Sequence, residues 1–195
     1  MSHDKLVIKT PIEGLLIINP EMFGDERGFF FESYNERRFA DLIGQEVHFI
    51  QDNHSRSSKN VLRGMHFQIQ QPQGKLVRVV KGCVWDVAVD LRINSKTFGK
   101  SFGCELSEFN HQQLWIPPGF AHGFLALSES VDFLYKTTAY WAPGFERSLL
   151  WNDPRVGVEW PLSDGQLPVL APKDAAGLSL DALLQSGELR HLVST

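Results

Sequence analysis

Cysteine is scarce in this 195-residue sequence, which contains only Cys83 and Cys104. Two thiols cannot build a disulfide framework, so we expect the reducing environment of the cytoplasm. No stretch approaches the roughly 18 consecutive apolar residues of a membrane-spanning helix, and the first residues lead into no apolar run that would suit a signal peptide. Positive charge is not in excess, and the net charge of -4 argues against nucleic acid as a partner.

Aromatic residues and glycine are abundant instead. The chain contains 14 Phe, 5 Trp and 16 Gly, which favours strands and turns over helices. Short apolar segments recur between turn signals, and no repeat or linker divides them. Many short strands on such a chain predict an all-β fold, an antiparallel sandwich or barrel with a few short helices. We expect one domain over residues 1–195, with an ordered C-terminal extension over about residues 165–195.

The clearest periodicity lies in residues 83–91, where apolar side chains alternate with residues that include Asp86 and Asp90. An apolar residue at every second position predicts a half-buried strand. A helix is expected over residues 35–43, because its apolar side chains share one face and a glycine follows it. A second short helix is expected over residues 179–184.

The first informative motif is Pro-Pro-Gly-Phe-Ala-His-Gly-Phe at residues 117–124. Its prolines and glycine predict a turn, after which His122 opens a strand. This resembles the second motif of the cupin superfamily of jelly-roll barrels. The first cupin motif, His-x-His with a downstream Glu, would fall at residues 64–68, where His66 is present and Gln68 replaces the second histidine.

This replacement bears on metal binding. A transition metal is held by three or four nitrogen, sulfur or carboxylate ligands, and His66 and His122 are the only candidates for such a cage. We therefore expect no catalytic metal, and a metal-dependent cupin oxygenase is disfavoured. The two histidines are then either structural or acid–base groups.

Several further segments surround these histidines with charged and aromatic residues: 24–33, 51–55, 61–68, 73–78, 134–138, 140–143 and 151–154. Taken together they resemble the dTDP-4-dehydrorhamnose 3,5-epimerase family over residues 23–174. The resemblance implies a cofactor-free enzyme that inverts C3 and C5 of dTDP-4-dehydro-6-deoxy-D-glucose. Protons next to the 4-keto group are acidic because the resulting anion delocalises onto the keto oxygen, so a base, an acid and a positive group suffice.

The resemblance also implies the catalytic roles. His66 would be the general base, a role that suits an imidazole with a pKa near working pH. Asp174 would orient it, Tyr135 would deliver a proton on the opposite face, and Lys75 would stabilise the enolate oxygen. Ala171 and Pro172 precede the Lys173–Asp174 pair where the family usually has a small polar residue, and the proline is expected to stiffen this approach.

The family pattern further implies a set of ligand contacts. Arg27 and Glu32 would reach the site of a neighbouring subunit, which implies a homodimer. Arg63 would bind the diphosphate, as a guanidinium does well, and Tyr140 would stack on thymine. The full set of implied substrate-binding residues is Arg27, Glu32, Gln51, Asp52, Asn53, Arg63, His122, Tyr140, Glu146 and Lys173.

Some expectations come from the residues alone. Arg63 stands within an apolar strand, and an inward-facing arginine must be paired or bound to a ligand. The aromatic residues Trp141, Phe145, Trp151 and Trp160 are expected in the core or an interface rather than against a ligand. Two alternatives remain open beside the oxygenase: an epimerase that inverts one carbon of another deoxysugar, and a non-catalytic cupin that binds a nucleotide sugar.

Overall fold

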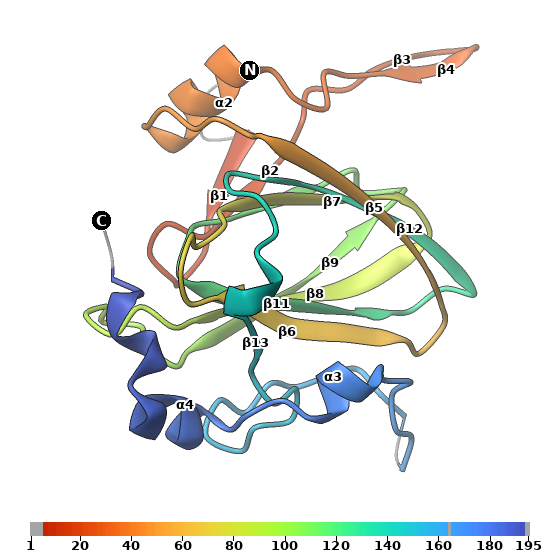
Figure 1. Ribbon diagram of the computed structural model, residues 1–195. Helices are drawn as coiled ribbons and strands as arrows, with labels where there is room; N and C mark the ends of the chain where they lie inside the picture. The colour runs from red at the N-terminus through yellow and green to blue at the C-terminus, as the bar shows by residue number, and fades with distance from the viewer. Residues whose placement is uncertain (1–5, 164, 194–195) are drawn as a thin grey trace.

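The computed structural model describes residues 6–163 and 165–193, which form mainly β-strands (Figure 1). The strands are β1 (Val7–Lys9), β2 (Leu16–Ile18), β3 (Phe23–Asp25), β4 (Gly28–Phe30), β5 (Gln51–Ser58), β6 (Leu62–Gln68), β7 (Lys75–Lys81), β8 (Cys83–Asp90), β9 (Ser101–Ser107), β10 (Gln113–Ile116), β11 (Phe120–Ala126), β12 (Ser130–Thr137) and β13 (Glu146–Ser148). The α-helices are α2 (Glu36–Ile43), α3 (Pro172–Ala175) and α4 (Leu180–Ser186), and the 3-10 helices are η1 (Pro143–Phe145) and η2 (Glu188–His191). None of the helices in the described ranges is long and apolar enough to cross a membrane.

Two sheets form the body of the molecule, and Figure 1 shows them face to face. The six-stranded sheet has the order β1-β2-β10-β7-β12-β5, and the five-stranded sheet has the order β13-β6-β11-β8-β9. From β6 to β8, and again from β10 to β12, the chain passes between the two sheets at each step. The strand pairs are antiparallel, which confirms the predicted all-β jelly-roll barrel.

Apolar side chains from both sheets fill the space between them. Val77 and Leu114 come from the six-stranded sheet, and Val84 and Phe124 come from the five-stranded sheet; all four are buried. Tyr135 is partly buried and packs against this core. The hydrophobic side chains therefore hold the two sheets together and leave polar groups at one margin of the core.

The C-terminal segment covers the outer face of the five-stranded sheet, as Figure 1 shows for α3 and α4. Leu180 and Leu183 of α4 belong to the same buried cluster as Val87 and Val89 of β8. Removing this apolar surface from water stabilises the segment on the sheet. Of the predicted extension, residues 165–193 contain α3, α4 and η2, and residues 194–195 lie outside the described ranges.

Strand β8 differs from its prediction because both of its faces are covered. Val84 and Ala88 belong to the core between the sheets, whereas Val87 and Val89 pack against the C-terminal segment. The half-buried interpretation of residues 83–91 is wrong: Asp86 and Asp90 are fully buried, like the apolar residues between them. Asp90 accepts hydrogen bonds from Arg92, at 2.8 Å for each of Nε and Nη2, and Asp86 contacts His122. Each aspartate is buried beside a partner, and the interaction with that partner offsets the free-energy cost of removing the carboxylate from water.

Both predicted helices are confirmed, and side chains cap each of them. The Asn35 side chain accepts a hydrogen bond from the Arg38 amide at the start of α2, and left-handed Gly44 ends that helix. Ser179 caps α4 in the same way, and Gly187 ends it. These are the residue types that satisfy the unpaired backbone groups at helix ends.

Two glycines let β6 and β11 approach closely. A Cβ added at Gly123 would lie 2.6 Å from the Arg63 carbonyl oxygen, and one added at Gly64 would lie 2.5 Å from the Gly123 Cα. Beside this contact His66 of β6 and His122 of β11 stand opposite each other in the ladder. The close approach therefore sets the spacing of the two histidine-bearing strands.

Strands β3 and β4 form a hairpin that projects from the sheets on the same side as α2 (Figure 1). The rings of Phe29 and Phe31 lie 4.8 and 5.6 Å from the His111 ring, which ties this segment to the turn after β9. Phe29 and Phe30 are nevertheless 63% and 67% exposed. The hairpin thus presents aromatic side chains away from the body of the protein.

Candidate active site

A cavity of about 340 Å³ lies between the two sheets, and α3 contributes to its wall. Strands β5, β7 and β12 supply residues from one sheet, and β6 and β11 supply residues from the other. Ten of the fourteen predicted site residues line it: Gln51, Asn53, Arg63, His66, Lys75, His122, Tyr135, Glu146, Lys173 and Asp174. The structure brings together side chains that are more than 100 residues apart in the sequence, as His66 and Asp174 are.

His66 and Asp174 form a hydrogen-bonded pair in this cavity. The His66 Nε2 lies 2.5 Å from the Asp174 Oδ1, and Asp174 is buried while the His66 side chain remains 21% exposed. Asp174 lies on α3, and Pro172 occupies the first turn of that helix. A proline is well suited to a first helical turn, so it fixes the approach to Asp174 without breaking a helix.

His122 forms a second, deeper pair with Asp86. Its Nε2 lies 3.0 Å from each carboxylate oxygen of Asp86, and both residues are buried. Burial lowers the pKa of His122, while the Asp86 carboxylate acts in the opposite direction. The imidazole is therefore held rigidly at the cavity wall by a buried carboxylate.

Lys75 brings a positive group into the same space. Burial lowers its pKa to about 8, against the opposing effect of the carboxylates of Glu146 and Asp86. Its Nζ lies 3.4 Å from the His66 carbonyl oxygen, which places the amine beside the histidine-bearing strand. A lysine with this pKa is still mostly protonated at neutral pH and is poorly solvated, so it can stabilise an anion strongly.

Tyr135 approaches from β12, in the sheet that faces His66. Burial raises the pKa of its hydroxyl, and the negative charge of Glu146 adds to the effect. The phenol therefore stays protonated at neutral pH and is available as a proton donor. His66 and Tyr135 reach the cavity from opposite sheets.

Arg63 lines the cavity, as expected of an inward-facing arginine. The residue is exposed, and its guanidinium reaches β5, where Nε donates to the Ser57 Oγ at 2.9 Å. The register between β6 and β11 shifts between His122 and Phe124, because β6 carries an extra residue. This irregularity breaks the strict alternation and lets Arg63 and His66, three positions apart, line one cavity.

Strict alternation along β5 separates the predicted residues of that strand. Gln51, Asn53 and Ser55 line the cavity, whereas Asp52 and His54 point to the other face of the strand. Asp52 pairs with Lys136 Nζ at 2.9 Å. The structure therefore does not bring the predicted Asp52 to the cavity.

Ser55 and Trp141 are among the cavity residues that the sequence predictions missed. The Ser55 hydroxyl is buried and has no hydrogen-bond partner among the described residues, which leaves it available to a ligand. The period-two spacing from Gln51 and Asn53 was the signal that could have found it. Trp141, expected in the core or an interface, lines the cavity instead, and its Nε1 lies 3.3 Å from Glu146 Oε1.

Glu146 and Lys173 also lie at this margin, where the Lys173 Nζ is 3.1 Å from Glu146 Oε2. Tyr140, predicted to stack on a base, is 63% exposed and is placed outside the cavity lining. Its neighbour Trp141 occupies the wall.

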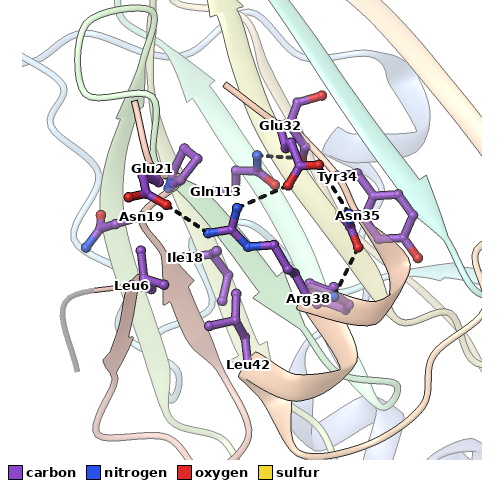
Figure 2. Close-up of a pocket in the computed structure, with 13 residues that line it drawn as sticks. Leu6, Ile18, Asn19, Glu21, Glu32, Tyr34, Asn35, Arg38, Leu42 and Gln113 are labelled. Atoms are coloured by element: carbon purple, nitrogen blue, oxygen red, sulfur yellow. Dashed lines mark hydrogen bonds and ion pairs between the residues drawn. The ribbon is translucent and has the colours of Figure 1, made fainter. Parts of the chain in front are cut away.

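Arg27 and Glu32 lie outside this cavity of their own chain. Arg27 sits at the turn of the β3–β4 hairpin, paired with Asp25, with its side chain 86% exposed. Figure 2 shows Glu32 in a small pocket beside α2, where Arg38 lies between Glu21 and Glu32. Hydrogen bonds from the side chains of Asn35 and Arg38 lower the pKa of Glu32, with Asn35 having the larger effect, so this carboxyl remains ionised.

Within residues 6–163 and 165–193, no three histidine, cysteine or acidic side chains gather as a metal site would require. The Nε2 atom of each cavity histidine faces a carboxylate. Such pairing fixes the orientation of an imidazole ring, as proton transfer requires.

The comparisons with known proteins place this arrangement in a family. The family model described as dTDP-4-dehydrorhamnose 3,5-epimerase matches residues 9–182. The chain is 59% identical over 180 residues to the Salmonella typhimurium protein of that name, covering 92% of this chain and 97% of the relative. It is 54% identical over 180 residues to the Escherichia coli K12 protein of that name, covering 92% and 96%.

Solved structures agree in fold. The structure of a dTDP-6-deoxy-D-glucose-3,5-epimerase from Legionella pneumophila, in complex with dTDP-4-keto-L-rhamnose, is 50% identical with a TM-score of 0.90, covering 97% of each chain. A 3'-monoepimerase from Streptomyces bikiniensis, in complex with dTDP-quinovose, is 29% identical with a TM-score of 0.85, covering 92% of this chain and 90% of the other. The chain described here belongs to the dTDP-4-dehydrorhamnose 3,5-epimerase family.

Proposed function

We propose that this protein inverts C3 and C5 of dTDP-4-dehydro-6-deoxy-D-glucose to give dTDP-4-dehydro-L-rhamnose. The observation that carries the proposal is the placement of His66 and Tyr135, which line one cavity from two facing sheets. Inversion needs a base on one face of the carbon and an acid on the other. A sugar ring between the two sheets would meet both.

The proposed reaction begins at His66. Its imidazole takes the proton next to the 4-keto group, and Asp174 orients the ring and stabilises the imidazolium that forms. The electron pair of the broken C–H bond moves onto the keto oxygen and gives an enolate. Tyr135 then donates its proton to the opposite face of the same carbon, and solvent restores the protonation states.

Lys75 is proposed to stabilise the enolate oxygen. Lys75 is buried in the cavity wall, where a charge acts through little water. His122 is fixed beside it by Asp86. A preorganised positive group loses little energy to reorganisation as charge develops on the oxygen.

The nucleotide diphosphate is proposed to bind toward β5. Arg63 presents its guanidinium there, and Gln51 and Asn53 face the same cavity. A guanidinium matches the geometry of phosphate oxygens. Glu146 and Lys173 are proposed to contact the ligand beside Trp141.

We also propose a homodimer in which the β3–β4 hairpin reaches the partner's site. The support is the exposure of Phe29 and Phe30 on a projecting hairpin that also carries Arg27. Large exposed aromatic patches mark interaction surfaces. Arg27 and Glu32 would then complete the partner's nucleotide site.

A cytoplasmic location is proposed with the enzyme. Cys83 stands opposite Ser107 and Cys104 stands opposite Asp86 in the β8–β9 ladder, so the two thiols are not cross-strand neighbours. Both are free, as a reducing compartment keeps them.

Solvent exchange tests the reaction directly. The protein is incubated with dTDP-4-dehydro-6-deoxy-D-glucose in heavy water, and the product is analysed by NMR. Deuterium is expected at both C3 and C5, with the configuration of L-rhamnose. Absence of label with folded protein and authentic substrate would refute the proposed activity.

The pattern of label separates the alternatives. Label and inversion at one carbon would indicate a single-carbon epimerase, like the Streptomyces bikiniensis relative, although its identity of 29% is well below the 59% of the Salmonella typhimurium 3,5-epimerase. Binding of dTDP without any label would indicate a non-catalytic nucleotide-sugar protein.

Tyr135→Phe sharpens the same experiment. The variant lacks the proton donor while His66 can still remove and return a proton on one face. We expect inversion to fall by roughly 10²–10⁴-fold, with deuterium exchange that retains configuration. Tyr34→Phe is the matched control, because Tyr34 lies outside the cavity. Full inversion by Tyr135→Phe would refute the assigned acid.

A further inference from the structure

The loop that leads from β12 to η1 is held by glutamine side chains. Gln68, which is buried, donates from Nε2 to the carbonyl oxygens of Gln71 at 2.8 Å and Tyr140 at 3.3 Å. Its Oε1 accepts a hydrogen bond from the Ala142 amide at 2.8 Å. Both donors and the acceptor of a primary amide are used, which the other neutral side chains of this length cannot reproduce.

Two further glutamines form hydrogen bonds to the backbone of Trp141 and Ala139. Gln51 Oε1 accepts a hydrogen bond from the Trp141 amide at 3.0 Å, and its Nε2 donates to Asn53 Oδ1 at 2.9 Å. Gln73 Nε2 donates to the Ala139 carbonyl oxygen at 2.9 Å. Each of residues 139–142 therefore receives a glutamine contact on its backbone, and we name Gln51, Gln68 and Gln73 the glutamine clamp.

Packing of the loop's own side chains does not account for its position. Tyr140 is 63% exposed and Trp141 is 56% exposed, so neither ring is anchored in the core. The Trp141 ring nevertheless lines the cavity, with its Nε1 3.3 Å from Glu146 Oε1. Gln68 also stands opposite Glu146 in the β6–β13 ladder. The same pair of residues therefore supports both the glutamine clamp and the contact between Trp141 and Glu146.

We propose that Gln68 is a positioning residue, which holds residues 139–142 so that Trp141 forms a fixed wall of the sugar-binding cavity. This proposal depends on the proposed function only for the identity of the ligand, a dTDP-sugar. Gln68 occupies the position at which the cupin motif has its second histidine, and here the side chain supports a loop through three hydrogen bonds.

Loss of the clamp should affect ligand affinity and the chemical step to different extents. A loop without the clamp must be ordered when the ligand binds, and that entropy cost weakens affinity. His66, Lys75 and Tyr135 lie on β-strands outside the loop. The chemical step should therefore change much less than the affinity.

Gln68→Met tests this, since methionine has similar length and no amide. We expect KM for the dTDP-sugar to rise roughly tenfold, with kcat changed by less than about twofold. Gln70→Met is the matched control: Gln70 is an exposed glutamine in the same stretch, and its variant should leave both constants unchanged.

A second readout follows Trp141 without substrate turnover. Acrylamide quenching is measured for each protein and for its Trp141→Phe counterpart, and the difference isolates Trp141 among the five tryptophans. Gln68→Met should increase the quenching of Trp141, and Gln70→Met should not.

The outcomes are decisive in each case. A folded Gln68→Met protein with unchanged KM and unchanged Trp141 quenching would overturn the proposal. If Gln68→Met does not fold, Gln73→Met, which loses one loop contact, must show increased quenching, and unchanged quenching would overturn it equally. A wild-type protein without epimerase activity would refute the proposed function, while the quenching experiment would still decide the role of the clamp.

Discussion

Lys75 illustrates how burial sets the chemistry of a single residue. In the sequence it follows a glycine and has the neighbours of an ordinary surface lysine. In the structure it is 7% exposed, and burial lowers its pKa to about 8 despite the carboxylates of Glu146 and Asp86. A weakly solvated ammonium is a strong partner for an enolate.

This pKa predicts a pH dependence of turnover. In the proposed mechanism only the protonated amine stabilises the enolate, and the protonated fraction falls as the pH rises through about 8. The contribution of Lys75 is therefore complete well below that pH, and kcat should decrease above it by up to about tenfold per pH unit. The pH profile of kcat measures the effect.

Lys75→Arg provides the comparison. A guanidinium remains charged throughout this range, so the alkaline decrease should move to higher pH even if the maximal rate is lower. A decrease at the same pH in both proteins would contradict the assignment to Lys75.

At the scale of elements, the glycines of β6 and β11 determine how the two histidine strands meet. A Cβ added at Gly123 would lie within 3 Å of the Arg63 carbonyl oxygen and of the Met65 sulfur. These neighbours belong to a buried strand and have little room to move. A side chain at Gly123 would separate the strands that carry His66 and His122.

Gly123→Ala should therefore destabilise the protein by about 1–3 kcal/mol, the usual cost of overpacking. Thermal or denaturant unfolding measures the change. Gly144→Ala is the matched control, because nothing lies within 4 Å of its added Cβ. Equal stability of the two variants would show that β6 and β11 can separate at little cost.

At the scale of the whole molecule, the proposed dimer divides each site between two chains. Arg27 lies on the projecting hairpin, whereas His66 lies in the cavity of its own chain. In a mixed dimer of Arg27→Ala and His66→Ala chains, one of the two sites keeps both residues. Random mixing should then restore about a quarter of the wild-type sites, measured as epimerase activity after co-expression.

A second mixture controls for this effect. His66 and Tyr135 line the same cavity, so a mixture of His66→Ala and Tyr135→Phe chains contains no site with both residues intact and should recover no inversion. Failure of the Arg27→Ala and His66→Ala mixture to regain activity would contradict the shared site.

The residues alone indicated the strands, both helices and an antiparallel sandwich or barrel, because these depend on local periodicity and on helix-end signals. The resemblance to cupins supplied the choice of a jelly-roll barrel. The resemblance to a family supplied the candidate site, and ten of its residues line one cavity. Alternation along β5 could also have separated Asp52 from Gln51 and Asn53, since successive side chains point to opposite faces.

Other features depended on contacts between distant segments. The burial of Asp86 requires the facing sheet, because Asp86 lies on the same face of β8 as Val84 and Ala88 of the core between the sheets. The extra residue in β6, which lets Arg63 and His66 share a cavity, is visible only in the pairing with β11. Local sequence thus determined which elements form, whereas tertiary packing decided which charges are buried and which side chains meet, because burial and register depend on segments far apart in the chain.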